Sequence, residues 1–153
     1  RDLPRAPVGR RVRLAVQPKS AECQVDRGPF GSLDRGALYV DVRERPVTVR
    51  CRHPKGYTEE DSLTLPVAAG HDPTEFSLAW RPTGVIPICP QATQGISVDG
   101  GSTRSGVVVD VTRFDGGGKK EVLVQFVLDG QLVEQRVNVV AGQAPKQVVC
   151  DAR

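Results

Sequence analysis

The sequence predicts an all-β protein made of two tandem, antiparallel β-sandwich modules behind an extended N-terminal arm. Three observations lead to this prediction. Apolar residues recur at every second position in one run after another, Gly- and Pro-containing turns separate the runs, and no segment carries a helical apolar stripe longer than about two turns. Because successive side chains of a strand point to opposite faces, each run lines one face of a strand. A chain of 153 residues can form one ordinary domain or two small ones.

The clearest alternation lies between Pro46 and Trp80. Turn-forming residues at 54–57 and 69–73 divide this stretch into three short runs. We therefore expect three strands of antiparallel sheet here. The runs are Val47/Val49/Cys51, Leu63/Leu65/Val67 and Phe76/Leu78/Trp80.

The chain before this stretch adds an arm and three more runs. Residues 1–11 contain four arginines, two prolines and too little apolar surface for a core, so they are predicted to form an extended arm or linker. Six runs in all are enough for one small immunoglobulin-like sandwich over residues 12–81. The three added runs are Val12/Leu14/Val16, Cys23/Val25 and Leu38/Val40/Val42.

The segment Arg81–Gly84 is the expected boundary, beyond which the same pattern starts again and predicts a second sandwich over residues 85–153. Asp115–Gly118 is expected to be a flexible hairpin loop, and Asp129-Gly130 is the strongest hairpin signal in the chain. The expected strands are 85–90, 95–101, Val107/Val109/Val111, Val122/Val124/Phe126/Leu128, Val133/Gln135/Val137/Val139 and 147–150.

Four cysteines, Cys23, Cys51, Cys89 and Cys150, favour two disulfides and therefore an oxidising compartment. Three pairings are possible. Cys23 and Cys51 both share a face with inward valines of the first half, so Cys23–Cys51 is the first choice, and Cys89–Cys150 then joins the first and last strands of the second half. The alternative is four buried free thiols in a cytosolic protein. No pair has the spacing of a zinc site, and we expect no metal.

The two halves share short landmarks at almost the same spacing, which indicates an internal repeat. Val25-Asp26-Arg27-Gly28 corresponds to Val98-Asp99-Gly100-Gly101, and Val67–Gly70 corresponds to Val139–Gly142. The cysteines do not align between the halves, which indicates that the bridges arose separately.

The segments Val16–Gly31 (VQPKSAECQVDRGPFG) and His53–Trp80 (HPKGYTEEDSLTLPVAAGHDPTEFSLAW) resemble the PEGA domain, a small β-sandwich module of bacterial extracytoplasmic proteins that often occurs in tandem. The second half resembles it at Val98-Asp99-Gly100, Asp129-Gly130 and Ala141-Gly142. The namesake tetrapeptide is absent, and Pro18–Ala21 is its nearest equivalent. The resemblance implies fold and compartment, and it transfers no catalytic residue.

Charge is unevenly spread along the chain. Residues 1–56 hold thirteen Lys and Arg against six Asp and Glu, whereas the rest of the chain holds eight against twelve. Arg50 and Arg52 are predicted to project from one sheet face, flanked by Arg43 and Arg45 on a neighbouring strand. An electropositive face suits an anionic partner. The candidate partner-binding residues are Arg1, Arg5, Arg10, Arg11, Arg43, Arg45, Arg50 and Arg52.

The residues favour a structural role over catalysis. His53 and His71 are both expected to be exposed loop residues rather than general bases, and we expect no enzyme activity and no cofactor. No apolar run approaches the ~20 residues that span a bilayer. The sequence thus predicts a scaffold or assembly module, periplasmic or extracellular, that docks to other protein subunits. The alternative is a module that binds an anionic cell-envelope polymer, a glycan or lipid headgroup, through the basic face. Nucleic acid is disfavoured because stacking aromatics are few.

Overall fold

The computed structural model describes residues 9–151, and every regular element within them is a β-strand. The chain divides into two compact units, Arg1–Ala79 and Trp80–Arg153, which we call module 1 and module 2. Each has two sheets, so the prediction of an all-β protein with two sandwich modules is confirmed. The division falls just before the expected segment at 81–84, and Thr83 and Gly84 already belong to a strand of module 2. Residues 1–8 of the expected arm lie outside the described residues.

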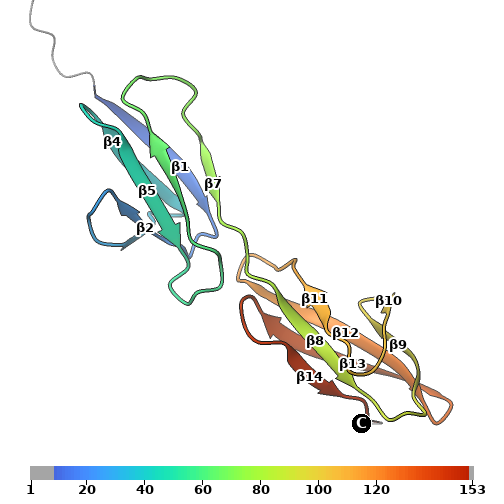
Figure 1. The fold of residues 1–153 in the computed structure, drawn as a ribbon. Helices are drawn as coiled ribbons and strands as arrows, with labels where there is room; N and C mark the ends of the chain where they lie inside the picture. The colour runs from blue at the N-terminus through green and yellow to red at the C-terminus, as the bar shows by residue number, and fades with distance from the viewer. Residues whose placement is uncertain (1–8, 152–153) are drawn as a thin grey trace, which may run out of the picture. The chain divides into compact units, whose positions relative to one another are not determined.

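Module 1 is a seven-stranded sandwich of one three-stranded and one four-stranded sheet (Figure 1). The three-stranded sheet has the order β4-β1-β7 and contains β1 (Arg10–Gln17), β4 (Ala37–Val42) and β7 (Glu75–Ser77). The four-stranded sheet has the order β3-β2-β5-β6 and contains β2 (Glu22–Val25), β3 (Gly31–Ser32), β5 (Val47–Arg52) and β6 (Asp61–Leu65). The last two residues of the expected arm, Arg10 and Arg11, therefore open a strand.

Module 2 repeats this topology strand for strand. Its sheets have the orders β11-β8-β14 and β10-β9-β12-β13, so adding seven to each strand number of module 1 gives the strand of module 2. The predicted internal repeat thus extends to the whole module. The strands are β8 (Thr83–Ile88), β9 (Gln94–Val98), β10 (Gly101–Ser102), β11 (Val109–Val111), β12 (Lys119–Leu128), β13 (Gln131–Val140) and β14 (Lys146–Val149).

The first and last strands of each module pair in parallel, which the sequence analysis did not anticipate. Strand β1 pairs with β7, and β8 pairs with β14. The third run of the 46–80 stretch, around Phe76, therefore lies in the sheet opposite β5 and β6. Alternation predicts which face of a strand is buried, but it carries no information on which strand is its neighbour.

Strand neighbours also correct the expectation at Asp115–Gly118. This segment is not a hairpin loop, because β11 and β12 belong to different sheets. The segment is a tight turn that carries the chain from one sheet to the other. Asp115 Oδ1 accepts hydrogen bonds from the backbone N–H groups of Gly117 and Lys119 at 2.9 and 3.2 Å. By contrast, Asp129-Gly130 joins β12 to β13 in full register, and both residues have positive φ. This is the conformation that a two-residue hairpin turn requires.

The core of each module comes from the inward residues of both its sheets. In module 1, Leu14, Val16 and Val40 of one sheet pack with Val49 and Cys51 of the other, all essentially buried. Module 2 has an equivalent cluster around Val85, Val122, Val124 and Phe126. Because burial of apolar area is the main stabilising contribution to folding, each module has its own source of stability.

An aspartate in the left-handed conformation ends the second strand of each module. Asp26 and Asp99, the landmarks of the repeat, have φ of 52° and 50°. The N–H of Asp26 donates to the Thr48 carbonyl at 2.8 Å, and the N–H of Thr48 donates back to Asp26 Oδ1 at 3.0 Å. Asp99 makes the same pair of bonds with Leu123, at 2.8 and 2.9 Å. Aspartate suits this position because its short side chain tolerates positive φ and supplies an acceptor.

These bonds predict a ranking of substitutions at Asp26. Asp26→Asn should be nearly neutral, Asp26→Gly should lose about 1 kcal/mol with the hydrogen bond, and Asp26→Ala should lose about 2 kcal/mol because it also strains φ. Amide hydrogen exchange of β5, read by NMR, measures the change in module 1 alone, and amides of module 2 serve as the internal control. Equal losses for Gly and Ala would show that the positive φ costs nothing.

Candidate interaction surfaces

Arg10 is the most constrained of the candidate arginines. Its guanidinium donates two hydrogen bonds to the carboxylate of Asp72, with Nε–Oδ2 at 2.8 Å and Nη2–Oδ1 at 2.9 Å. It also donates to the backbone carbonyls of Pro66 and Val67, at 2.6 and 2.7 Å. The hydrogen bond from Arg10 lowers the pKa of Asp72 below its ordinary value. Arg10 thus holds the β6–β7 connection against β1, so its charge stabilises module 1 and is not directed at a partner. Arg1 and Arg5 lie outside the described residues.

The arginines on the sheet faces have acidic or aromatic neighbours. Arg52 pairs with Glu22 at 2.7 Å and lies over the ring of Phe30 at 3.7 Å. Arg50 approaches Glu60 at 3.6 Å. On the other sheet, Arg11 lies 3.9 Å from an Asp41 oxygen and 5.0 Å from the Tyr39 ring centroid. The predicted outward projection of Arg50 and Arg52 agrees with their exposure, but much of the positive charge on this face is countered by carboxylates.

Arg43 and Arg45 do not flank Arg50 and Arg52 on a neighbouring strand, which corrects the expectation. The neighbours of β5 are β2 and β6, and Arg43 and Arg45 lie in the connection from β4 to β5. Both are exposed and form no ion pair with any residue in the described part of the chain. With Arg27, they line shallow, open hollows that also contain Asp26, Asp41 and Glu44.

His53 is buried, so the expectation of an exposed loop residue was wrong for this histidine and right for His71. Its ring stacks on Tyr57 with 4.5 Å between centroids, and its Nδ1 accepts the backbone N–H of Lys55 at 3.1 Å. Burial, with a smaller contribution from the nearby Lys55 charge, lowers the pKa of His53. The imidazole stabilises the turn at residues 53–56, and its neutral form is the one that the hydrogen bond requires.

Module 2 carries an exposed apolar surface that the charge pattern of the sequence does not reveal. Ile86 and Ile88 alternate along the outer face of β8, and Val149 of β14 lies opposite Ile88. Val107 and Val108 precede β11, and Val108 lies directly over Gly84 of β8. The exposed fractions are 38% for Ile88, 61% for Val149, 44% for Val107 and 46% for Val108. We call these residues and Ile86 the apolar face.

The corresponding surface of module 1 has smaller and more polar side chains. Strand register aligns Ile86, Ile88 and Val149 with Ala15, Gln17 and Ser77 of β1 and β7. The sequence contained a signal for the difference: Val85-Ile86-Pro87-Ile88 is apolar at every position with two large outward isoleucines, whereas the aligned Leu14-Ala15-Val16-Gln17 has a small and a polar residue at the outward positions. A strand that is apolar on both faces indicates cover on both faces.

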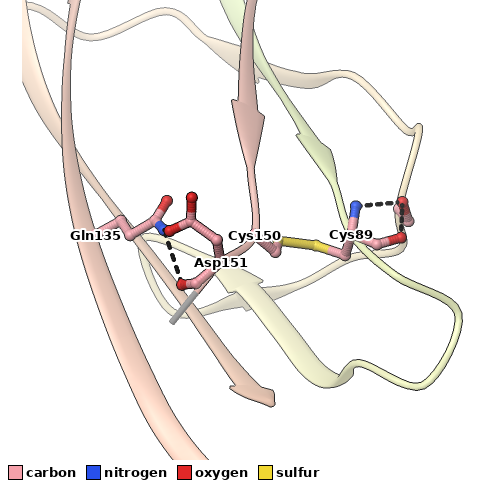
Figure 2. The surroundings of a disulfide bond; sticks show 5 residues. Cys89, Gln135, Cys150 and Asp151 are labelled. Atoms are coloured by element: carbon pink, nitrogen blue, oxygen red, sulfur yellow. Dashed lines mark hydrogen bonds between the residues drawn. A yellow bond between two sulfur atoms is a disulfide. The ribbon is translucent and has the colours of Figure 1, made fainter. Parts of the chain in front are cut away.

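Both expected disulfides are present, Cys23–Cys51 and Cys89–Cys150. Cys23 and Cys51 are register partners on β2 and β5, inside the core. Cys89 and Cys150 follow the ends of β8 and β14, and Figure 2 shows this bridge next to Asp151 and to Gln135 of β13. The Nε2 group of Gln135 lies 3.3 Å from the Asp151 carbonyl oxygen. Because Cys89 follows Ile88 and Cys150 follows Val149, the bridge lies at one end of the apolar face.

The described residues contain no group of three or more His, Cys, Asp or Glu side chains arranged to hold a metal ion. Residues 9–151 form no helix of the length and apolarity that crossing a membrane requires. Comparison with protein-family models, with curated proteins and with solved structures finds no match to this chain.

The buried His53 predicts a pH dependence for module 1. Because the folded state lowers the pKa of His53 from its ordinary value of 6.5, the folded module disfavours the imidazolium. The free energy of unfolding should be highest well above pH 6.5 and should fall as the pH drops through 6.5, where the unfolded chain gains its proton first. Exchange rates of β5 amides measured between pH 5 and pH 8 and corrected for intrinsic exchange test this. His53→Gln should flatten the dependence, whereas His71→Gln should leave it unchanged.

Proposed function

We propose that the chain is a non-enzymatic scaffold module of an extracytoplasmic bacterial assembly, in which it docks to other protein subunits. The observation that carries this proposal is the apolar face of module 2. Four of its side chains are more than one-third exposed, on a sheet whose first and last strands are linked by a disulfide. Contiguous apolar surface of this kind marks sites of contact with other proteins.

The surroundings of the apolar face suit a protein partner. Asp110 of β11 and Gln147 of β14 point outward beside Gly84 and Ile86, so polar groups border the apolar centre. An apolar centre with a polar rim is the usual composition of a protein–protein interface. The partner surface that fits is one with exposed aliphatic or aromatic side chains at its middle.

The disulfides support the compartment in this proposal. Disulfides form and persist in secreted and periplasmic proteins and are rare in the reducing cytosol. Two bridges in a chain of this length therefore favour a periplasmic or extracellular location. Membership of the PEGA family would agree with this location and remains a prediction from the residues quoted above.

The alternative function, binding of an anionic envelope polymer, has one observation in its favour. Arg27, Arg43 and Arg45 are exposed around the β4–β5 connection, without ion-pair partners among residues 9–151. The acids Asp26, Asp41 and Glu44 lie among them and reduce the local potential, and Arg10, Arg50 and Arg52 are engaged with carboxylates. A polyanion would therefore meet a mixed surface, which is why we favour a protein partner.

Site-specific photocrosslinking in the native host tests the proposal. A photoreactive amino acid at Val149, the most exposed residue of the apolar face, should give one discrete protein adduct. The same residue at Ser77, the aligned position of module 1, should not. Absence of any adduct from Val149, combined with retention on an anionic polysaccharide that is lost in Arg43→Ala/Arg45→Ala, would favour the alternative.

A further inference from the structure

Strand β13 is the longest edge strand in the described part of the chain. It spans ten residues, Gln131–Val140, and pairs with β12 on one side only. It contains no proline and no bulge interrupts its pairing with β12. Its counterpart in module 1, β6, has five residues and is followed at once by Pro66. Short edge strands and prolines are the usual protection against pairing with another chain, and β13 has neither.

The hairpin turn decides which backbone groups of β13 are available. In a two-residue hairpin the closing pair, here Leu128 and Gln131, is hydrogen bonded, and bonded pairs then alternate. The even-numbered residues from 132 to 138 therefore turn their N–H and C=O groups away from β12. The Asn138 carbonyl shows this directly, because it accepts a hydrogen bond from the Nζ group of Lys146 at 3.3 Å.

The outward side chains of β13 carry a charge pattern that is complementary to itself. Glu134 and Arg136 are both exposed and lie on the outer face, on either side of Gln135. If a second β13 pairs antiparallel with its two-fold axis at Gln135, Glu134 of each chain faces Arg136 of the other. Val133 then faces Val137. The same register pairs even-numbered residues with even-numbered residues, which is the set whose backbone groups point away from β12.

We infer that β13 is a self-association edge, which joins the four-stranded sheets of two copies of this chain into one continuous sheet. The two interchain ion pairs extend a row of cross-strand side-chain bonds that already exists within each chain. Arg136 bonds Glu121 of β12 at 2.8 Å, and Glu134 accepts from Gln125 of β12 at 2.8 Å. Opposite charges directly across two strands stabilise the pairing, whereas like charges there destabilise it. Like charges at positions 134 and 136 would instead disfavour pairing of β13 with the β13 of a second copy.

This inference rests on the proposed scaffold function and names a second copy as one partner. It uses the β13 edge of the four-stranded sheet, whereas the docking surface proposed above is the outer face of the three-stranded sheet. The two can therefore be tested apart.

Two single charge reversals test the inference in the full chain. Glu134→Arg makes both positions positive and Arg136→Glu makes both negative, so either substitution should weaken self-association at least tenfold, measured by sedimentation equilibrium over about a hundredfold range of concentration. Mixed in equal amounts, the two variants should form a heterodimer as tight as the wild-type dimer, because every pair then has opposite charges. Arg113 is exposed and lies outside the strands, so Arg113→Glu is the control for the net-charge change of Arg136→Glu and should leave association unchanged.

Amide hydrogen exchange gives the register independently. In the dimer, the N–H groups of Leu132, Glu134 and Arg136 should become protected as concentration rises, and this protection should be absent in either single variant. A wild-type chain that stays monomeric, or a dimer that both reversals leave intact, would overturn the inference. In that case a Val149 adduct with another protein would still support the scaffold function. If Val149 gives no adduct while the β13 dimer forms as described, the proposed docking through the apolar face is overturned and the self-association of β13 stands.

Discussion

Parallel pairing between the first and last strands is the contact on which each module depends. Val16 pairs with Phe76 in module 1, and Pro87 pairs with Val148 in module 2. The equivalence extends to single bonds: the N–H of Leu78 donates to the Gln17 carbonyl at 2.9 Å, and the N–H of Cys150 donates to the Ile88 carbonyl at 3.0 Å. This pairing completes the three-stranded sheet and covers the core, so each module closes on itself. Module 2 adds a covalent link at the same place, through Cys89 and Cys150.

The two modules share a topology and differ in what they leave exposed. Module 1 has charged and polar side chains on its outer faces, and several of the charged ones pair with one another or hold a loop, as Arg10 holds the β6–β7 connection. Module 2 leaves an apolar outer face and a long free edge strand. The same fold thus presents two different surfaces: the outer faces of module 1 are mainly charged and polar, and module 2 exposes an apolar face and an unpaired edge strand. In a scaffold, an exposed apolar face and a free edge strand determine which partners dock, because the fold itself is common to both modules.

Alternation made most of the fold predictable from the sequence, because a period of two reports directly on strand faces. It placed Cys23 and Cys51 on one buried face and thereby ranked the disulfides correctly. It did not predict strand neighbours, which depend on contacts between distant residues, so Phe76 was assigned to the wrong sheet and Arg43 and Arg45 to a neighbouring strand. His53 follows a strand and precedes a proline, which suggested exposure, but it is buried and stacks on Tyr57 across the turn, a contact that leaves no periodic signal in the sequence. The apolar face was visible in Val85–Ile88 as a strand apolar at every position.

The central claim is that the chain forms two separately closed seven-stranded modules, each with one internal disulfide. Peptide mapping of the unreduced protein, isolated from its native source with free thiols blocked, tests this most directly. We expect two cross-linked peptide pairs, Cys23 with Cys51 and Cys89 with Cys150, and no blocked thiol. A bridge between a cysteine of module 1 and one of module 2 would contradict separate closure, and free thiols in the native protein would contradict both the bridges and the oxidising compartment that they indicate.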